Sequence, residues 1–466
     1  MGKMESVALV LLMVQVVTSS SADAAWPGNS DLQELNVEEA IAGTKVKAQK
    51  EADELEEKRE KWKVEVFHRD KVDQNKGRDH GSRFKARMKR DVKRVVSLVR
   101  RVNADRNTEA EEEASFGSDV EEGSGEYFVR VGIGSPVTYQ YMVIDSGSDV
   151  VWVQCEPCHQ CYNQSDPIFN PAHSASFAGV PCSSAVCGQL DDAGCHDGTC
   201  RYEVSYGDGS STRGTLALET LTLGRAIIRN TAIGCGNINQ GMFVGAAGLL
   251  GLGAGPISFV GQLGAQTGGA FAYCLLSRGT ASSGSLQFGR AAMPVGAAWV
   301  PLIPNPFFPS FYYVALSGLG VGGSRLNISE ELFRVTELGD GGAVMDTGTA
   351  VTRLPTAAYG ALRDAFVAQT TNLPRAPPVS IFDTCYDLDG FVTVRVPTVS
   401  FYFSGGQILT LPARNFLIPA DALGTFCFAF AASPSGLSII GNIQQEGIQI
   451  SVDGANGFVG FGPNTC

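Results

Sequence analysis

The stretch VIDSGSDVVWVQ, residues 143–154, places an Asp after two apolar residues and before a Ser-Gly-Ser turn. The same order of residue types returns as AVMDTGTAV, residues 343–351. One such turn is common in large proteins, because Asp, Ser and Gly all favour turns. Two copies in matching contexts indicate a duplicated fold that brings two carboxylates, Asp145 and Asp346, to one place.

Two adjacent carboxyl groups are suited to hydrolysing a peptide bond, because like charges this close cannot both ionise and therefore share one proton. One group accepts a proton from a water molecule while the other donates a proton. Each Asp needs a Gly that lets backbone N–H groups face it, and hydroxyls that hold its outer oxygen or pin the two loops together. The residues expected to support the pair are Ser146, Gly147 and Ser148 in the first copy, and Thr347, Gly348 and Thr349 in the second.

The repeat extends beyond the two Asp motifs. A run of two aromatic residues and a Val precedes each motif, at 127–129 and at 312–314. An apolar pair followed by Gly comes after each motif, at 249–251 and at 439–441. Short alternating runs between frequent Gly turns predict an all-β protein. One helix is expected after the second Asp, with Thr356 as its N-cap.

The overall composition excludes some partners. The chain has 466 residues, of which 44% are apolar, so it can bury a sizeable core. Its formal charge is −12. A nucleic-acid or anionic-membrane partner is not expected, since either would favour a basic surface. The twelve Cys all lie from Cys155 onward, and an even number in an exported chain predicts disulfides.

The N-terminus has the pattern of an export signal. Lys3, an apolar run at 7–17 and the small residues at 22–24 predict a signal peptide over residues 1–24. No stretch is long and apolar enough to span a bilayer. A lipid anchor is not expected, because the sequence lacks the hydrophobic tail that would signal one. We therefore expect an exported, soluble monomer in the apoplast, with the vacuole or the endoplasmic reticulum as alternatives.

Residues 25–122 are crowded with charge. We expect helices at 37–64 and at 83–101. The second helix would bury valines that recur at helical spacing, namely Val92, Val95, Val96 and Val99. The segment is either a solvated linker or an inhibitory prosegment whose basic helix lies on the acidic remainder of the chain. A prosegment would be released in acid, because protonated carboxylates no longer attract Lys and Arg.

Patterns typical of other chemistries are weak. The histidines after residue 122, His159, His173 and His196, all lie in the Cys-rich segment, so no Ser-His-Asp arrangement follows the repeat. The Cys spacing at 155–161 is compatible with a zinc or redox site, but disulfides are favoured in an exported chain. The Gly-rich run at 248–255 lacks the Lys of a phosphate loop. We expect no metal and no cofactor.

Together these motifs resemble the pepsin-like aspartic proteases, and in particular the nepenthesin-type, or atypical, plant branch that includes the guard-cell proteases. The resemblance covers residues 123–466 and includes YGDGS at 206–210 and FDTCY at 382–386. It implies a bilobal, all-β fold with short helices. The N-terminal lobe would span residues 123–295 and the C-terminal lobe residues 296–466.

The resemblance also implies a flap that closes over the substrate. Tyr206 would be the flap residue, and Trp152 would be its hydrogen-bond partner. The flap hairpin would continue through Gly207, Asp208 and Gly209.

For the Cys residues, the resemblance implies six disulfides: Cys155–Cys158, Cys161–Cys235, Cys182–Cys200, Cys187–Cys195, Cys274–Cys466 and Cys385–Cys427. One departure from the family is Ser146, where Thr is commoner; Ser retains the hydroxyl and loses a methyl. Two sequons predict N-glycans at Asn163 and Asn327.

The sequence thus predicts an aspartic endopeptidase that is made as an exported zymogen, is inhibited by its own prosegment and is active in acid. A water held between Asp145 and Asp346 would attack an extended polypeptide. The alternative is a catalytically inactive pepsin-fold protein that binds or inhibits another protein. Such proteins usually lose an Asp motif, whereas this chain retains both.

Overall fold

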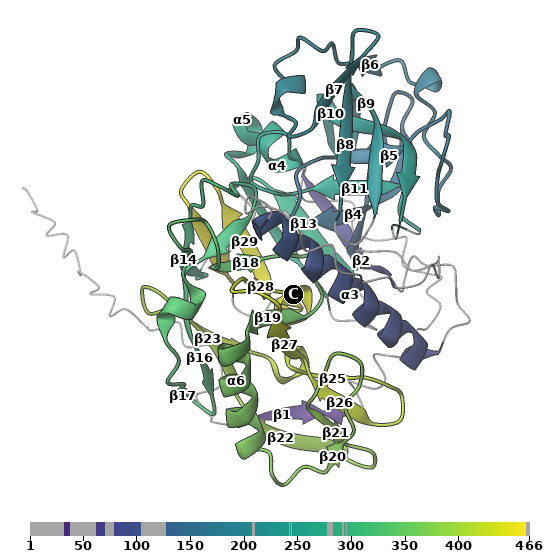
Figure 1. Ribbon diagram of the computed structural model, residues 1–466. Coiled ribbons are helices and arrows are strands. Elements are labelled where there is room, and N and C mark those ends of the chain that lie inside the picture. The colour runs from purple at the N-terminus through teal and green to yellow at the C-terminus, as the bar shows by residue number, and fades with distance from the viewer. Residues whose placement is uncertain are drawn as a thin grey trace, which may run out of the picture.

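Each half of the chain folds into a lobe of short strands. The computed structural model describes residues 32–37, 62–69, 79–103 and 127–462, except 207–209, 242, 244, 277–282, 291–292 and 295. Figure 1 shows one lobe in teal at the top and the other in green and yellow below. The bilobal, all-β fold expected from the sequence is confirmed. The expected signal peptide lies outside the described residues.

The first lobe is built around a long antiparallel hairpin, β9 with β10. Its strands are β4 (Thr138–Asp145), β5 (Trp152–Gln154), β6 (Ala178–Gly179), β7 (Ala193–His196), β8 (Thr199–Ser205), β9 (Ser211–Leu223), β10 (Ala226–Gln240) and β11 (Gly248–Gly251). Strand β11 runs parallel to β4, with Leu249 opposite Val143 and Gly251 opposite Asp145. The first apolar-apolar-Gly run is therefore the strand that supports the first Asp.

The second lobe repeats this arrangement. Its strands are β15 (Tyr312–Val314), β16 (Leu316–Val321), β17 (Ser324–Arg325), β18 (Ala343–Met345), β19 (Thr352–Pro355), β20 (Arg375–Ala376), β21 (Cys385–Asp387), β22 (Thr393–Pro397), β23 (Val399–Phe403), β24 (Ile408–Leu411), β25 (Leu417–Pro419), β26 (Thr425–Phe428), β27 (Phe430–Ser433) and β28 (Ser438–Ile440). Strand β28 runs parallel to β18, with Ile439 opposite Val344. A Cβ on Gly441 would lie 2.6 Å from the carbonyl oxygen of Ala350, so this position needs Gly.

A continuous antiparallel sheet joins the two lobes. Its order is β4-β3-β2-β13-β12-β29-β30-β14. The strands not yet given are β2 (Lys63–His68), β3 (Tyr127–Ile133), β12 (Ala270–Cys274), β13 (Gly284–Phe288), β14 (Ala298–Ile303), β29 (Gln449–Asp453) and β30 (Phe458–Phe461). Strand β2 comes from the charged N-terminal segment, and it pairs with β13 on one side and β3 on the other.

Strand β2 corrects one expectation. Residues 63–64 were expected to end a helix, but they begin this strand, in which Val64 and Val66 are buried and Lys63 and Glu65 are exposed. The alternation of apolar and charged residues has the two-residue period of a strand. A second strand from the N-terminal segment, β1 (Leu32–Asn36), pairs with β22 of the second lobe.

Few helices accompany the strands in the described part of the chain. They are α3 (His80–Asn103), α4 (Phe259–Gln262), α5 (Gly264–Thr267), α6 (Thr356–Ala368) and α7 (Asn442–Gln445), with 3-10 turns at Pro171–His173, Cys187–Gln189, Glu330–Phe333 and Ala413–Asn415. None of the described helices is long and apolar enough to cross a membrane. Helix α6 buries Tyr359, Leu362 and Phe366 as expected, but its N-cap is Pro355, so the predicted cap at Thr356 is wrong. The backbone of Pro355 is extended, with a ψ of 140°, so the helix begins only at Thr356.

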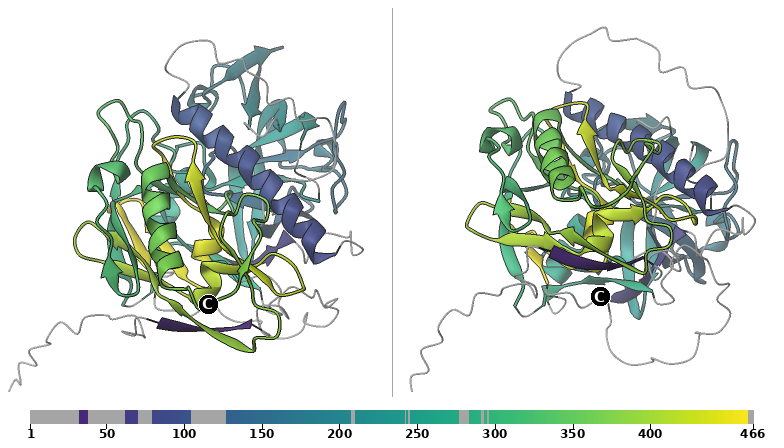
Figure 2. Two further views of the ribbon diagram at one scale, coloured as in Figure 1. Left: turned by 60° about the horizontal axis from the view of Figure 1, so that its bottom comes forward. Right: turned by 90° about the horizontal axis from the view of Figure 1, so that it is seen from below.

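Helix α3 crosses the face of the molecule where the two lobes meet (Figure 1, Figure 2). The helix expected at 83–101 is confirmed and is longer at both ends. Val95 and Val99 are buried as predicted, whereas Val92 is 38% exposed and Val96 is only partly buried. The buried face is longer than the valines indicated, because Phe84 and Met88 extend it toward the start of the helix by about two turns.

The disulfides differ from those that the resemblance implied. The pairs Cys155–Cys158 and Cys161–Cys235 are wrong, because Cys155 bonds to Cys235 and Cys158 bonds to Cys161. Strand β5 runs parallel to β10, with Val153 opposite Cys235, so Cys155, which directly follows β5, lies near that Cys. The Cα atoms of Cys155 and Cys235 are 5.3 Å apart.

The pairs Cys182–Cys200 and Cys187–Cys195 are also wrong, since Cys182 bonds to Cys195 and Cys187 bonds to Cys200. The two pairs differ in burial. Cys187 and Cys200 lie together in a small apolar cluster, whereas Cys182 is partly buried and Cys195 is exposed. The pair Cys385–Cys427 is confirmed, and the two residues face each other across β21 and β26.

The expected pair Cys274–Cys466 ends on a residue outside the described range.

Candidate active site

The two Asp residues meet where the lobes join. Asp145 is the last residue of β4, and Asp346 directly follows β18. Both are 1% exposed. The loops that carry them are bonded to each other, because Ser146 N–H donates to Thr347 Oγ1 at 3.1 Å and Thr347 N–H donates to Ser146 Oγ at 2.9 Å. Ser146, with its missing methyl, therefore makes the same reciprocal bond as Thr347.

Each carboxylate is held by its own loop in the same way. The N–H of Gly147 donates to Asp145 Oδ1 at 3.1 Å, and the hydroxyl of Ser148 donates to Asp145 Oδ2 at 2.6 Å. The second carboxylate repeats this arrangement with Gly348 N–H at 3.0 Å and the Thr349 hydroxyl at 2.5 Å. One oxygen of each group is thus fixed by a hydroxyl and the other by a backbone N–H.

The two Gly residues also allow the loops to approach each other. A Cβ on Gly147 would lie 2.8 Å from Asp346 Oδ1, and a Cβ on Gly348 would lie 2.6 Å from Asp145 Oδ1. Each Gly therefore makes room for the carboxylate of the opposite loop, which no larger residue could do.

The Trp and Tyr expected to form the flap lie in contact. Trp152 Nε1–H donates to Tyr206 Oη at 2.9 Å. Both rings pack edge-on against Phe243, with ring centres 5.0 Å and 5.2 Å from it. This cluster fixes the base of the hairpin, whose tip at Gly207, Asp208 and Gly209 lies outside the described residues.

A cation from helix α3 lies between the two Asp residues. Arg94 Nη2 is 2.6 Å from Asp145 Oδ1 and 3.1 Å from Asp346 Oδ1, while Nε donates to Asp346 Oδ2 at 3.2 Å. The Arg94 side chain is 9% exposed. One nitrogen therefore bridges the same two oxygens that the Gly N–H groups hold.

The sequence analysis did not single out Arg94. A signal was present, because Arg87, Arg94 and Arg101 recur at intervals of seven residues, which places them on one face of a helix. The sequence predicted that this helix buries its valines and that its basic charge as a whole lies on the acidic remainder of the chain. Only the pair Arg90-Asp91 stands out among its charged residues, because it resembles prosegment motifs of the family.

Burial and Arg94 set the protonation of the pair. Burial raises the pKa of Asp145 above its usual value, and the charge of Asp346 adds to the rise while Arg94 opposes it. Burial acts on Asp346 too, but the charge and hydrogen bonds of Arg94, with the Thr349 hydroxyl, bring the pKa of Asp346 below its usual value. Arg94 donates twice to Asp346 and once to Asp145, so with α3 in place a proton resides more readily on Asp145.

Other polar residues of α3 reach the loops and repeated segments around the pair. Arg87 Nη2 donates to Asn442 Oδ1 at 2.7 Å, and Arg101 Nη1 donates to the carbonyl oxygen of Gly147 at 3.0 Å. Asp91 accepts hydrogen bonds from the N–H groups of Ala350 and Val351 at 2.7 Å and 2.9 Å. The helix is thus bonded to the loops of both Asp residues.

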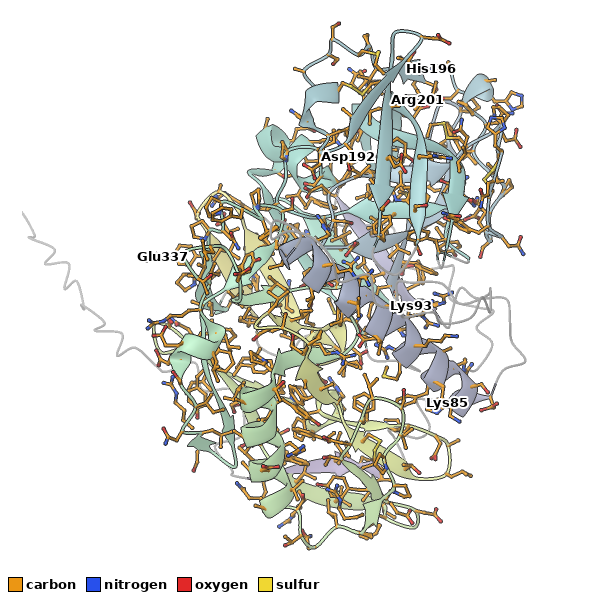
Figure 3. All side chains as sticks on the ribbon, viewed as in Figure 1. Lys85, Lys93, Asp192, His196, Arg201 and Glu337 are labelled. Atoms are coloured by element: carbon orange, nitrogen blue, oxygen red, sulfur yellow. A yellow bond between two sulfur atoms is a disulfide. The ribbon has the colours of Figure 1, made fainter. Side chains whose placement is uncertain are left out.

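The remaining candidate residues lie at the surface. His159, His173 and His196 are exposed, and Figure 3 places His196 at the far end of the first lobe. Among the described residues, no group of His, Cys, Asp and Glu is arranged to hold a metal ion. The side chains of the two sequons, Asn163 and Asn327, are exposed.

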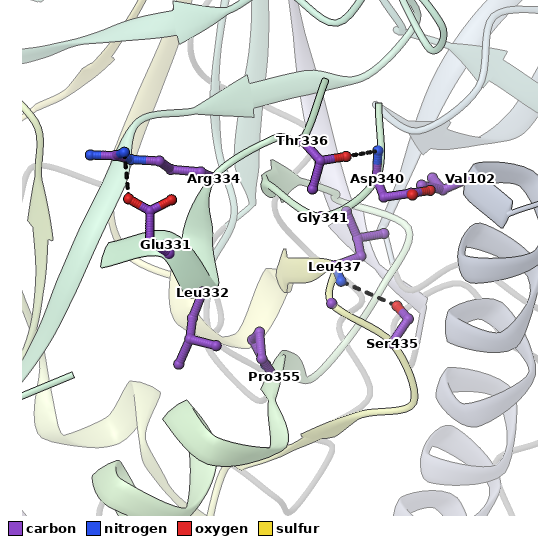
Figure 4. A pocket seen from close by; sticks show the side chains of 11 residues that line it. Val102, Glu331, Leu332, Arg334, Thr336, Asp340, Gly341, Pro355, Ser435 and Leu437 are labelled. Carbon is purple, nitrogen blue, oxygen red and sulfur yellow. Dashed lines mark hydrogen bonds and ion pairs between the residues drawn. The ribbon is translucent and has the colours of Figure 1, made fainter. Parts of the chain in front are cut away.

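A pocket of about 210 Å³ lies in the second lobe, beside the end of α3 (Figure 4). Its lining includes Val102, Pro355 and Leu437, together with the ion pair of Arg334 and Glu331. Neither Asp145 nor Asp346 lines it, so it is separate from the carboxylate pair.

Both halves of the chain match known protein families. Residues 127–290 match the family described as xylanase inhibitor N-terminal, and residues 311–463 match the family described as xylanase inhibitor C-terminal. The protein ASPARTIC PROTEASE IN GUARD CELL 2 of Arabidopsis thaliana is 64% identical over 418 residues, which cover 88% of this chain and 89% of that protein. Aspartic proteinase nepenthesin-2 of Nepenthes gracilis is 41% identical over 386 residues, which cover 81% of this chain and 86% of that protein.

Solved structures share the fold at lower identity. The crystal structure of edgp has a TM-score of 0.59 at 19% identity, covering 72% of this chain and 91% of that chain. Conglutin gamma from lupine seeds has a TM-score of 0.59 at 21% identity, covering 76% and 93%. At these identities the likeness concerns the fold alone. The family matches and the relatives show that the chain belongs to the plant pepsin-like aspartic proteases, among the nepenthesin-type members.

Proposed function

We propose that this protein is an aspartic endopeptidase in which Asp145 and Asp346 together hold and activate a water molecule. The observation that carries the proposal is the symmetry of the pair. Each buried carboxylate accepts a backbone N–H on one oxygen and a hydroxyl on the other. The two Oδ1 atoms that Arg94 bridges are those between which a water would bind to both groups.

The reaction follows from the shared proton. Once Arg94 leaves, one carboxylate of the pair is ionised and the other is protonated. The ionised group takes a proton from the water as the water oxygen bonds to the peptide carbonyl carbon, and the protonated group donates to the carbonyl oxygen. The carbon–nitrogen bond then breaks as the group that took the proton from the water passes it to the amine nitrogen, while the other carboxylate takes a proton from a hydroxyl of the intermediate. Ser148 and Thr349 keep the outer oxygens occupied, so that the inner oxygens face the substrate.

We further propose that residues 25–122 are a prosegment and that α3 is its inhibitory element. Arg94 neutralises both carboxylates and fills the space between them. Strand β2 ties the same segment into the central sheet. Because the helix is bound partly by ionised carboxylates, acid weakens its docking and releases it.

The processed enzyme would consist of two lobes at residues 123–295 and 296–466, with the central sheet between them. Its substrate would be an extended polypeptide lying where α3 now lies, under the Tyr206 hairpin. Apolar side chains would flank the scissile bond, since the apolar residues of α3 pack there against Phe311 and Ile439 among others.

We propose export through the signal peptide to the apoplast, with the vacuole or the endoplasmic reticulum as alternatives, and action as a monomer. N-glycans at Asn163 and Asn327 are compatible with this route, because both side chains are exposed.

A second candidate is a catalytically inactive protein that binds another protein, and the descriptions of the two matched families favour it. The intact pair with its complete set of hydrogen bonds favours the enzyme, because a binding protein has no need of two buried carboxylates. The two candidates differ in whether the processed protein cleaves peptides.

The experiment is acid treatment of the secreted precursor, followed by N-terminal sequencing and digestion of a peptide library with and without pepstatin. We expect a new N-terminus near Gly123 and pepstatin-sensitive cleavage, both lost in Asp145→Asn and Asp346→Asn. The matched control is Asp389→Asn, at an exposed carboxylate, which should cleave like the wild type. A new N-terminus without cleavage would rule out the enzyme and leave the binding protein.

A further inference from the structure

The carboxylate of Asp91 on helix α3 lies in a complete binding site for an anion. Its Oδ1 accepts N–H bonds from Ala350 at 2.7 Å and from Val351 at 2.9 Å. Its Oδ2 accepts a hydrogen bond from the guanidinium of Arg353, with which it forms an ion pair. The Asp91 side chain is 0% exposed and that of Arg353 is 7% exposed, so the carboxylate is buried between α3 and the second lobe.

The donors belong to the folded lobe rather than to the helix. Arg353 lies on β19, which pairs with β27 on one side and with β28 on the other. The loop before it is fixed by two backbone bonds, from Asn442 N–H to Thr349 O at 2.8 Å and from Ile443 N–H to Ala350 O at 3.0 Å. When α3 is released, the two N–H groups therefore stay aimed at the same point.

Loss of α3 would leave this site without its anion. Arg353 Nε is already buried without a hydrogen-bond partner among the described residues. Release of α3 opens the guanidinium and the two N–H groups to solvent, and water is a weaker partner for them than a carboxylate. An incoming carboxylate could satisfy all of them through charge-assisted hydrogen bonds.

The site lies close to the cleavage point. Asp91 precedes Arg94 by three residues on one helix, which is about 4.5 Å along the helix axis. An extended peptide advances about 3.3 Å per residue. A residue one or two positions from the scissile bond could thus place its side chain at Arg353.

We infer that Arg353, with the N–H groups of Ala350 and Val351, forms a subsite that selects an acidic side chain in the substrate. Arg353 is a specificity-determining residue, and Asp91 occupies its subsite in the precursor. The inference rests on the proposed protease function, because it concerns the substrate of the same site. A terminal carboxylate has the same chemistry, so the test peptides are amidated at the C-terminus.

The first test uses the acid-activated full-length protein and paired peptides with Glu or Gln at each position around the cleaved bond. At one position, Glu should raise kcat/KM about ten-fold over Gln. In Arg353→Gln this ratio should fall to about one, while cleavage of the Gln peptides continues. The matched control is Arg325→Gln, which removes an Arg of the same lobe that pairs with Glu330 at the surface.

Equal cleavage of Glu and Gln peptides by the wild type would overturn the inference and leave the protease function intact. A preference for Glu that survives in Arg353→Gln would also overturn it. Failure to cleave any peptide would contradict the protease function instead, and the second test then decides on the anion site alone.

The second test needs no catalysis and uses the unprocessed chain with Asp91→Ala, at neutral pH. Sodium acetate, compared with sodium chloride at equal ionic strength, should raise the melting temperature of this variant by about 2 °C, since the anion binds the folded state. Neither the wild type nor the double variant with Arg353→Gln should respond. No shift in Asp91→Ala, or an equal shift in the double variant, would show that the site does not bind carboxylates.

Discussion

Arg94 and Asp145 form an ion pair in which Nη2 lies 2.6 Å from Oδ1, with the Asp side chain 1% exposed. The same nitrogen lies 3.1 Å from Asp346 Oδ1. A single cation is therefore shared by two buried carboxylates that would otherwise repel each other. We expect the stability of the unprocessed chain and the proposed latency to depend on this contact.

Replacing Arg94 with Gln should destabilise the unprocessed protein by about 3 kcal/mol, because it leaves two buried carboxylates without their cation. It should also speed processing, since the helix loses its bond to the pair. Thermal unfolding at neutral pH and the rate of appearance of the new N-terminus measure the two effects. Arg100→Gln is the control on an exposed residue of the same helix and should change stability by less than about 0.5 kcal/mol. Equal behaviour of the two variants would contradict the role of Arg94.

The pH dependence of the stability of the unprocessed chain should come mainly from Asp346. Its pKa is lowered in the folded protein by Arg94 and Thr349 against the effect of burial, so its contribution to stability is present above the usual value of 3.8 and is lost as pH falls through the lowered pKa. The pKa of Asp145 is raised by burial, so Asp145 is protonated before Asp346 as the pH falls. Its protonation removes the energetic penalty of a buried charge and does not destabilise the fold. The melting temperature of Asp346→Asn should therefore fall less than that of the wild type between about pH 5 and pH 2. Parallel curves for the two proteins would show that another group governs acid release.

Ser146 tests the bond between the two loops. Ser146→Ala removes the acceptor of the Thr347 N–H, a buried bond of 2.9 Å, and should cost about 1–3 kcal/mol of stability. It should also lower kcat/KM by about ten-fold, because the carboxylates are less well aligned. Ser146→Thr keeps the hydroxyl and should stay within about 1.5 kcal/mol of the wild type. If Ser146→Ala and Ser146→Thr gave the same kcat/KM, the hydroxyl would have no part in alignment.

Trp152 and Tyr206 should act as a unit. Trp152→Phe and Tyr206→Phe each remove the bond of 2.9 Å between the indole and the phenol, and each should lower kcat/KM by about five-fold. The double variant should be no worse than either single variant, because both remove one interaction. Multiplicative losses in the double variant would show that the two side chains act separately.

The corrected disulfides predict unequal effects on stability. The Cys155–Cys235 bond closes a loop of 80 residues, whereas the Cys158–Cys161 bond spans 3. Replacing both Cys of the first pair with Ala should cost about 4 kcal/mol, and replacing the second pair should cost much less, because a short loop has little freedom to lose. Chemical denaturation compares them, and peptide mapping under non-reducing conditions identifies the pairs. A Cys155–Cys158 peptide in the map would contradict the structure.

Much of the carboxylate site could be predicted from the sequence, because its parts are local. Asp145 with Ser148, and Asp346 with Thr349, each lie within one short turn, so the order of residues largely determines their hydrogen bonds. Because that turn is duplicated, the sequence also predicted that the two carboxylates lie together and act as a pair. The pairing of Trp152 with Tyr206 came from family resemblance rather than from spacing, and the structure agrees with it.

The tertiary structure alone decided which distant residues meet. The sequence alone allows Cys155 to form a disulfide with either Cys158 or Cys235. The parallel pairing of β5 with β10 brings Cys235 close to Cys155 and so decides between them. In the sequence, Arg94 is one of many charges on a basic helix, and Asp91 belongs to the Arg90-Asp91 pair that resembles prosegment motifs of the family. Only the docking of α3 across both lobes places Arg94 between the two Asp residues and Asp91 on Arg353. Local sequence determines turns and their hydrogen bonds, but contacts between segments far apart depend on how whole strands and helices pack.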